Sequence, residues 1–231
     1  MSLRLMVLDR TPPGIRRQLV VARHQLVNQL PDAWHGVHTS RHVELSSLGL
    51  DHPERAKYEP GSWRTIPSVL RQRDVGEHDV FLDLGCGAGR QLIVAAKYGF
   101  QRVIGIDLAP ELIALARENV SNVKSRWILG SSRRTTPIDL VCSDVLDYDI
   151  PPTVSVVFMF NPFRGALFSA VLTKLLHSVD EYPRRLRIIY SNPHEASRLI
   201  ATGRADHVRS ATAGRFDVRL YEIVEKETSV S

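Results

Sequence analysis

The sequence predicts an α/β fold built on a doubly wound, mostly parallel, seven-stranded sheet, with a C-terminal antiparallel hairpin and an N-terminal helical cap. Three observations support this prediction. From Val80 onward, short apolar runs alternate with segments of helical periodicity, as in sheets covered by helices on both faces. The first apolar run ends in a glycine-rich turn. The chain before this region lacks the alternation, so two domains are expected, at 1–73 and 74–231.

The N-terminal third is predicted to be helical near both of its ends. Apolar residues at helical spacing predict a helix over 15–30, which Pro31 is expected to end. Residues 31–62 mix histidines, glycines and prolines, and they are predicted to form a loop with one short helix. A second helix is predicted at 63–73.

The rest of the chain is predicted to alternate strands with helices in a Rossmann-like order. The strands are expected at 80–84, 102–106, 139–142, 154–160, 186–190, 206–211 and 215–224. The helices are expected at 91–98, 110–119, 166–178 and 193–200. Residues 121–137 are rich in Ser, Arg and Thr and are predicted to be an exposed connection. The short link at 212–214 predicts a closing hairpin, so one of the last two strands should run antiparallel.

Composition excludes several classes of protein. Of 231 residues, 43% are hydrophobic and 24% charged, which excludes an intrinsically disordered chain. Cys86 and Cys142 form no CxxC pair, and this usage is typical of a reducing compartment, so a cytoplasmic location is predicted. The apolar run at 156–160 is far shorter than the roughly 20 residues of a membrane span, and no membrane partner is expected.

The net charge of +5 lies in the N-terminal third. Residues 1–73 carry 11 Lys and Arg against 6 Asp and Glu, whereas the remaining residues carry 19 of each kind. Arginine binds phosphate and carboxylate through a planar fork, so this region is suited to an anionic partner. A merely solvated surface is the alternative explanation.

The strongest chemical signal is the glycine loop that follows the first predicted strand. Gly85, Gly87 and Gly89 form a G-x-G-x-G turn, one residue shorter than the dinucleotide fingerprint, and Asp83 stands two positions before it. A carboxylate at this place would repel a pyrophosphate and attract an ammonium group. The loop therefore favours a ligand that carries an amino-acid group over a dinucleotide.

Three further predicted strands also end in polar residues. Asp107 ends the second strand, 24 positions after Asp83, where doubly wound folds place an acid that binds ribose hydroxyls. Asp144 follows the third strand, and Asn161 follows the fourth, with Phe163 two positions later. Because the carboxyl ends of parallel strands lie at one edge of the sheet, these residues predict a single ligand site.

Residues 80–163 resemble the core of class I S-adenosylmethionine-dependent methyltransferases. The matching segments are FLDLGCGAGR, VIGIDLAPELIALAREN, VCSDV and FMFNPF, and the likeness extends over about residues 58–224. Uncharacterised bacterial methyltransferases with NPF at the fourth position are similar as well. The resemblance implies a transferase (EC 2.1.1.-) that takes S-adenosyl-L-methionine as its cofactor and releases S-adenosyl-L-homocysteine.

The resemblance also implies a role for each matching position. The loop is expected around the methionine part of the cofactor, Asp107 at the ribose, Leu108 and Val145 on the adenine, and Asp144 at the adenine edge. The expected cofactor-binding residues are Tyr58, Trp63, Asp83, Gly85, Cys86, Gly87, Gly89, Asp107, Leu108, Asp144, Val145 and Asn161. Tyr58 and Trp63 enter this set as aromatic residues that cap the cofactor.

Asn161 and Phe163 are the predicted catalytic residues. Enzymes that methylate amino groups often carry Asn/Asp-Pro-Pro-aromatic here, where the Asn accepts a hydrogen from the target nitrogen. In this chain the second proline is missing, but Asn161 can still accept a hydrogen bond and Phe163 can stack on a flat or cationic group. The methylated atom is therefore left open between nitrogen, oxygen and carbon.

The acceptor is predicted to be a small molecule or an amine-bearing group, and a protein or a nucleic acid (RNA or DNA) is the alternative. Two other classes stay open: an NAD-dependent oxidoreductase, and a non-catalytic module that binds nucleotides or nucleic acid. His38 and His42 are four positions apart, but no metal site is predicted because partner ligands at the required spacing are missing. One of the N-terminal histidines or His194 is the candidate general base. The oligomeric state is left open.

Overall fold

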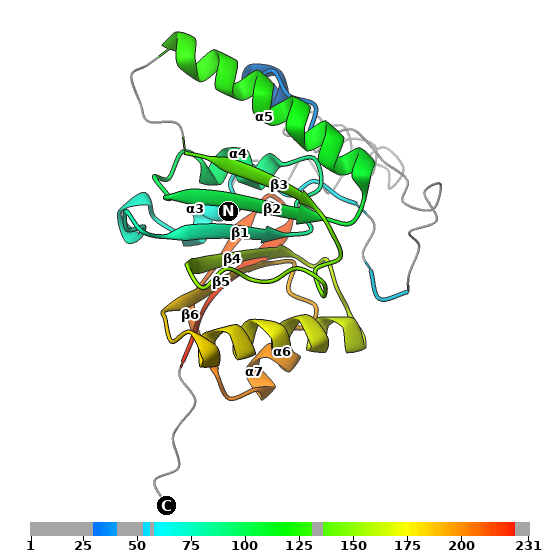
Figure 1. Ribbon diagram of the computed structural model, residues 1–231, viewed down its shortest axis with the longest axis vertical. Helices are drawn as coiled ribbons and strands as arrows, with labels where there is room; N and C mark the ends of the chain where they lie inside the picture. Colours follow the sequence, from blue (N-terminus) through cyan, green and yellow to red (C-terminus); the bar gives the residue numbers. More distant parts are fainter. Residues whose placement is uncertain (1–29, 41–52, 56–57, 131–135, 225–231) are drawn as a thin grey trace, which may run out of the picture.

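The structure of the protein is a computed structural model that describes residues 30–40, 53–55, 58–130 and 136–224 (Figure 1). The helix predicted at 15–30 lies outside these residues, except for Leu30 at its end. Residues 30–35 are helical, so the prediction that Pro31 ends helical structure is wrong. The fixed φ of proline is compatible with helical backbone, so this residue type alone does not end a helix.

A seven-stranded sheet with the strand order β3-β2-β1-β4-β5-β7-β6 forms the centre of the molecule. All pairings from β3 to β5 are parallel, whereas β7 runs antiparallel to both β5 and β6. The predicted seven-stranded, mostly parallel sheet and its antiparallel hairpin are therefore confirmed, while most of the predicted N-terminal helical cap lies outside the described residues. The strands are β1 Val80–Leu84, β2 Arg102–Asp107, β3 Ile138–Cys142, β4 Val154–Phe160, β5 Leu186–Ser191, β6 Ala205–Ala213 and β7 Phe216–Ile223.

Helices cover both faces of this sheet (Figure 1). One apolar cluster joins α6 and α7 to residues such as Leu82 of β1, and a second joins α3, α4 and α5 to residues such as Phe81. Successive side chains of a strand point to opposite faces, so β1 is buried along its whole length. The helical elements are α3 Thr65–Val69, the 3₁₀ turn η2 Gln72–Asp74, α4 Arg90–Ala95, α5 Pro110–Gly130, α6 Gly165–Glu181 and α7 Ala196–Ala201.

Two helices differ clearly from the sequence prediction. α5 runs to Gly130 and occupies much of the predicted connection at 121–137, because Val120 and Val123 continue its apolar face and pack against Val37 and Ile93. The helix predicted at 63–73 is limited to the five residues of α3, since the backbone is extended at Leu70, and a 3₁₀ turn follows.

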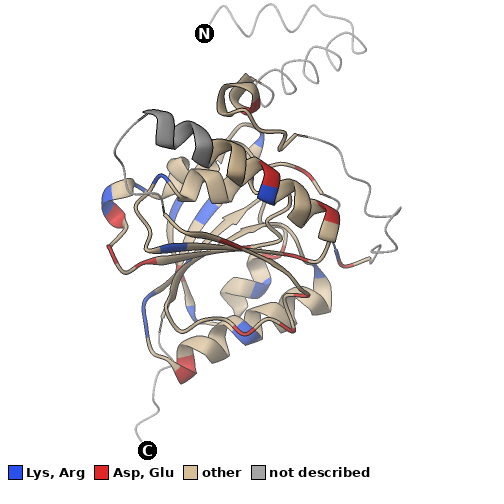
Figure 2. Ribbon diagram, turned by 45° about the horizontal axis from the view of Figure 1, so that its top comes forward, with Lys and Arg blue, Asp and Glu red and all other residues tan. Residues whose placement is uncertain are grey.

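The order of the strands creates a switch point between β1 and β4. The chain leaves β1 towards β2 and β3 and then returns to build β4 on the other side of β1. Ligands of open α/β sheets bind at such a point, outside the carboxyl ends of the strands. In the described part of the chain, basic and acidic residues are interspersed along the ribbon (Figure 2). None of the helices described is long and apolar enough to cross a membrane.

Candidate functional site

A pocket opens at the carboxyl ends of β1, β2 and β4, at the switch point. Its other walls come from Arg55, residues 58–61, the start of α4, and the turns after β3 and β5. Ten of the predicted site residues line it: Tyr58, Asp83, Gly85, Cys86, Asp107, Leu108, Asp144, Val145, Asn161 and Phe163. The predicted residues Trp63, Gly87 and Gly89 are not among the lining residues.

The glycine loop has backbone angles that favour glycine. Gly85, Gly87 and Gly89 have φ values of +82°, +53° and +82°. A Cβ atom on Gly87 would lie 2.2 Å from Cε2 of Tyr58, so this ring lies directly on the loop. A Cβ atom on Gly89 would lie 3.2 Å from the Cβ of Ala116, which makes Gly89 a packing position between α4 and α5. Of the three glycines, only the first lines the pocket itself.

Asp107 at the end of β2 is held in place by two backbone amides. Its Oδ2 accepts a hydrogen bond from the N–H of Gly87 at 2.9 Å, and its Oδ1 accepts one from Ala109 at 3.0 Å. Burial raises the pKa of Asp107, and these amides partly oppose the rise. A carboxylate can accept about four hydrogen bonds, so Asp107 keeps acceptor capacity for a ligand in the pocket.

Asp83 is the most unusual group of the pocket. Its side chain is only 1% exposed, and its Oδ1 has no hydrogen-bond partner within the described part of the chain. Burial, together with the negative charge of Asp107, raises its pKa well above the ordinary value. A buried acceptor without a partner destabilises a protein, so such a group is expected where a ligand supplies the donor.

Two amide side chains repeat this pattern beside Asp83. Asn161 Oδ1 and Gln91 Oε1 are buried and lack a partner among the described residues. The orientation of Gln91 is fixed, because its Nε2 donates to the carbonyl of Ser62 at 2.9 Å. Asn161 has a φ of +42°, so its backbone is in the left-handed region. Three residues that line the pocket thus carry buried, unpartnered oxygen acceptors, which suits a ligand rich in N–H or O–H donors.

Asp144 is already engaged by protein groups. Its Oδ2 forms an ion pair with Arg55 at 2.7 Å, and its Oδ1 accepts a hydrogen bond from the N–H of Leu146 at 3.0 Å. Arg55 also forms an isolated β-bridge with Phe163, while Glu54 accepts hydrogen bonds from two amides at the start of α6. Residues 53–55 therefore run beside the rim of the pocket and join its β3 side to its β4 side.

Trp63 lies one layer outside the pocket, and the described histidines lie away from it. The indole N–H of Trp63 donates to Asp32 at 3.0 Å, and its ring packs under the guanidinium of Arg90, 5.4 Å from ring centroid to Cζ. His38 and His194 are exposed and do not line the pocket. No group of three or more His, Cys, Asp or Glu side chains able to hold a metal occurs among the residues that the structure describes.

Arg55, Arg90 and Asp32 are site residues that sequence reasoning missed. Arg55 meets Asp144 across 89 positions of sequence, and Arg90 meets Asp32 across 58, so neither pair belongs to a local motif. Arg90 offered one usable signal, because it directly follows the glycine loop at the first position of a buried helix. A charged residue at such a position requires partners from elsewhere in the fold.

Comparisons with known proteins find methyltransferases. Residues 81–181 match a family model described as a methyltransferase domain. The chain is 30% identical over 117 residues to a ribosomal protein L11 methyltransferase of Thiobacillus denitrificans, a match that covers 49% of this chain and 38% of that protein. It is 29% identical over 152 residues to a protein-lysine N-methyltransferase of Saccharolobus islandicus, covering 65% of this chain and 89% of that protein.

Among solved structures, an RNA methyltransferase from Salinibacter ruber in complex with S-adenosyl-L-homocysteine is similar. It has a TM-score of 0.46 and 22% sequence identity, and the match covers 68% of this chain and 88% of that one.

Proposed function

We propose that this chain, whose residues 81–181 match a methyltransferase domain model, is an S-adenosylmethionine-dependent methyltransferase that acts on an amine-bearing acceptor. The observation that carries the proposal is the set of three unpartnered buried oxygens, on Asp83, Gln91 and Asn161, in one pocket beside the glycine loop. The chain spans 38% of the length of the ribosomal protein L11 methyltransferase that it matches, so its activity as a whole is part of the proposal.

The residues of the pocket fit the cofactor. Asp83 Oδ1 lacks a partner in a buried place, and the ammonium group of the cofactor would supply it with both a donor and a positive charge. Asp107 retains acceptor capacity for the two ribose hydroxyls. Leu108 and Val145 would pack on the adenine. Asp144 would receive the adenine amino group only on lone pairs that Arg55 and Leu146 leave available.

The acceptor would reach the pocket at the end of β4. When bound, S-adenosylmethionine would supply a methyl group on a sulfonium, open to in-line attack by the acceptor atom. Asn161 Oδ1 would accept a hydrogen bond from the acceptor nitrogen and so direct its lone pair, and Phe163 would pack against the acceptor. The mostly buried lining of the site would exclude water from the reaction.

Small amines are our first choice of acceptor, and side chains of a protein are the second. The second choice rests on the relatives, because two of them are named for the methylation of proteins. Both choices place the methyl group on nitrogen, which agrees with a pocket that offers oxygen acceptors to N–H donors. An acceptor of either kind would be recognised through the same side chain of Asn161.

Substitution Asn161→Gly tests the proposal without adding backbone strain, because glycine adopts the φ of +42° freely. The variant should transfer labelled methyl groups from S-adenosylmethionine about a hundredfold more slowly, as expected when one positioning hydrogen bond of a transition state is removed. Its affinity for S-adenosylhomocysteine should stay within about twofold, since Asn161 would face the acceptor.

The assay would offer a panel of primary amines, lysine- and arginine-containing peptides, and phenolic compounds as controls. Transfer to amines or peptides supports the proposal and also separates the two choices of acceptor. Transfer to phenolic oxygen alone would contradict the nitrogen assignment. Failure of the unmodified chain to bind S-adenosylhomocysteine would contradict the proposal as a whole.

A further inference from the structure

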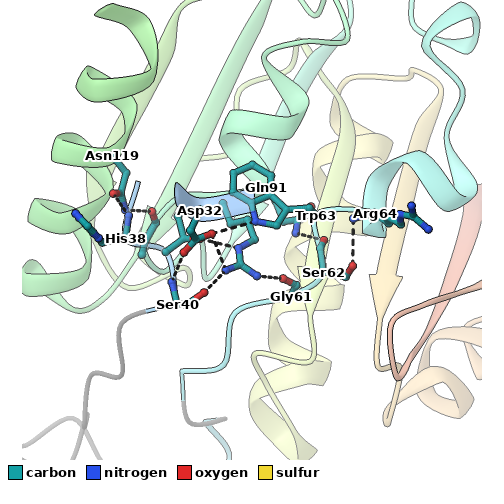
Figure 3. A network of polar contacts seen from close by, with 12 residues as sticks. Asp32, His38, Ser40, Gly61, Ser62, Trp63, Arg64, Gln91 and Asn119 are labelled. Carbon is teal, nitrogen blue, oxygen red and sulfur yellow. Dashed lines mark hydrogen bonds and ion pairs between the residues drawn. The ribbon is translucent and has the colours of Figure 1, made fainter. Parts of the chain in front are cut away.

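We infer that Arg90 is a positioning residue that fixes Tyr58 on the glycine loop, and that residues 30–40 thereby form part of the cofactor site. The effect on a ligand rests on the proposed function, but the arrangement itself is visible in the structure. Arg90 is the first residue of α4 and directly follows Gly89, and its side chain is 3% exposed. Its guanidinium bonds to two segments that lie far from it in the sequence, at Asp32 and Ser40 and at Gly61, which are labelled in Figure 3.

Tyr58 packs directly on the glycine loop. The ring lies so close to Gly87 that a single added methyl group would come within 2.2 Å of it. The hydroxyl of Tyr58 donates a hydrogen bond to the carbonyl oxygen of Thr39 at 2.7 Å. Burial raises the pKa of Tyr58, so this hydroxyl keeps its proton at physiological pH. The position of the ring therefore depends on where Thr39 is held.

Thr39 is completely buried, and hydrogen bonds to Asp32 and Arg90 hold it in place. Its hydroxyl donates to Oδ1 of Asp32 at 2.8 Å and accepts a hydrogen bond from Nε of Arg90 at 2.6 Å. Oδ2 of Asp32 accepts a further hydrogen bond, from the N–H of Ser40 at 2.8 Å. Side chains and backbone of this short segment are thus tied to one carboxylate and one guanidinium.

Arg90 also makes hydrogen bonds to Asp32, Ser40 and Gly61. Its Nη2 donates to Asp32 Oδ1 at 3.0 Å and to Ser40 Oγ at 2.7 Å, while Nη1 donates to the carbonyl of Gly61 at 2.5 Å. Burial lowers the pKa of Arg90, and the charge of Asp32 opposes this effect. One side chain thereby aligns residues 30–40 and the segment that follows Tyr58 with the glycine loop.

The loop carries this alignment into the pocket. The N–H of Gly87 donates to Oδ2 of Asp107, the carboxylate proposed to hold the ribose. Tyr58 packs on the same glycine and itself lines the pocket. When Tyr58 moves away, the peptide that orients Asp107 loses its support, and one wall of the pocket is lost. Arg90 also lines the pocket itself, and we assign its positioning effect on the ligand to these neighbours.

The test is a double-mutant cycle on the affinity for S-adenosylhomocysteine, with variants Arg90→Gln, Tyr58→Phe and their combination. Tyr58→Phe keeps the ring but removes its bond to Thr39. Each single variant should bind about tenfold more weakly, and the double variant should be no weaker than the worse single variant, because residues that act through one contact couple strongly. Effects that add up fully would overturn the inference.

Arg187→Gln is the matched control. Arg187 is 4% exposed and is paired with Asp79, but it lies at the opposite edge of the sheet and away from the pocket. The control should lower the unfolding temperature as Arg90→Gln does, and its affinity should equal that of the unmodified chain. An equal loss of affinity in Arg187→Gln would reduce Arg90 to a general contributor to stability. Arg90→Lys and Thr39→Val replace Arg90→Gln in the cycle if the latter fails to fold.

A measurement without ligand separates this inference from the proposed function. Amide hydrogen exchange at Gly87 and Gly89 in the free protein should become about tenfold faster in Arg90→Gln and in Tyr58→Phe, and not in Arg187→Gln. Unchanged exchange in the first two variants would overturn the positioning role. If the unmodified chain binds no S-adenosylhomocysteine, the proposed function fails, while the exchange rates still decide whether Arg90 positions the loop.

Discussion

The sheet has an amino edge, where its parallel strands begin, and a carboxyl edge, where they end. Each edge contains an ion pair between a buried arginine and an aspartate, yet the two edges differ in whether every nearby carboxylate has a partner. At the amino edge, Arg187 binds Asp79 at 2.8 Å and the carbonyl of Asp74 at 2.7 Å, and Asp79 also accepts a hydrogen bond from the N–H of Gly76. At the carboxyl edge, Arg90 has bonds of the same kind, but Asp83 close by has an oxygen without a partner. The amino edge satisfies its carboxylate within the protein, whereas the carboxyl edge leaves one for a ligand.

The pKa values of the two aspartates express this difference. Burial raises the pKa of Asp83 well above the ordinary value, and the charge of Asp107 raises it further. Burial alone would also raise the pKa of Asp79, but hydrogen bonds from Ser155 and Gly76 and the charge of Arg187 outweigh it and lower the value. Functional sites often retain such strained groups at the expense of stability, and structural ion pairs do not.

The largest expected effect comes from the glycines of the two edges. Gly87→Ala adds a methyl group that collides with Tyr58 at a φ of +53°, so the free energy of unfolding should fall by about 2–5 kcal/mol. The affinity for S-adenosylhomocysteine should fall about a hundredfold, because the loop and Tyr58 must both move.

Gly203→Ala is the control for this substitution. Gly203 precedes β6 at the amino edge, has a φ of +66°, and has nothing within 4 Å of the added atom. The substitution should therefore lower the free energy of unfolding only by the backbone strain, about 1–2 kcal/mol, and leave the affinity for S-adenosylhomocysteine unchanged. Equal losses of affinity in both variants, measured by calorimetric titration, would remove the distinction between the two edges.

The next effect comes from the two aspartates, whose replacement should change stability in opposite directions. The pKa of Asp83 is raised on folding, so its contribution is most favourable below pH 3.8 and is lost as the pH rises through the folded value. Asp83→Asn should therefore make the free protein more stable at neutral pH. The affinity for S-adenosylhomocysteine should fall about tenfold, because residue 83 then has no negative charge to pair with the ammonium group of the ligand.

Asp79→Asn is expected to do the reverse. The pKa of Asp79 is lowered on folding, so its contribution is present above pH 3.8 and is lost as the pH falls through the folded value. The variant should be less stable at neutral pH by about 2 kcal/mol and should bind normally. Urea unfolding at several pH values measures both effects, and a destabilised Asp83→Asn would contradict the account of Asp83.

Proton release offers an independent measure of Asp83. A bound ammonium group would lower the raised pKa of Asp83, so binding should release a proton at pH values below the raised pKa and should strengthen as the pH rises through it. Titrations in buffers of different ionisation enthalpy report this release. The release should disappear in Asp83→Asn, and its persistence there would assign it to another group.

The smallest expected effect is that of Gln91. Gln91→Leu removes an unpartnered oxygen, but it also removes the hydrogen bond to Ser62. The affinity for the donor-rich ligand should fall about threefold, since a neutral hydrogen bond is worth about 1 kcal/mol or less. Stability should change little, because two opposing effects nearly cancel. A gain in affinity would show that the oxygen of Gln91 meets no donor in the complex.

The sequence predicted the sheet and the strand ends because both depend on local patterns. Asp83, Asp107 and Asn161 each follow a buried apolar run, and the parallel order brings such ends together without further information. The extension of α5 was not predictable in this way, since its last turns depend on packing against Val37 and Ile93 from other parts of the chain. Helix length often depends on such tertiary contacts.

The contacts that complete the pocket were beyond the reach of sequence reasoning for the same reason. The bonds from Arg90 to Asp32 and from Arg55 to Asp144 each join segments more than 50 positions apart. The place of Arg90 or Arg55 in the sequence does not indicate which aspartate it contacts. Trp63 was expected to cap the cofactor as an aromatic near the sheet, but the structure places it on Arg90, outside the pocket lining.

Calorimetric titration of the full chain with S-adenosylhomocysteine measures whether the carboxyl edge binds the proposed cofactor. We expect one binding site, and we expect the free energy of binding to weaken by more than about 1 kcal/mol in Asp107→Ala, because the ribose hydroxyls lose a charged acceptor. Absence of binding by the unmodified chain, or an equal affinity of the unmodified chain and Asp107→Ala, would contradict this expectation.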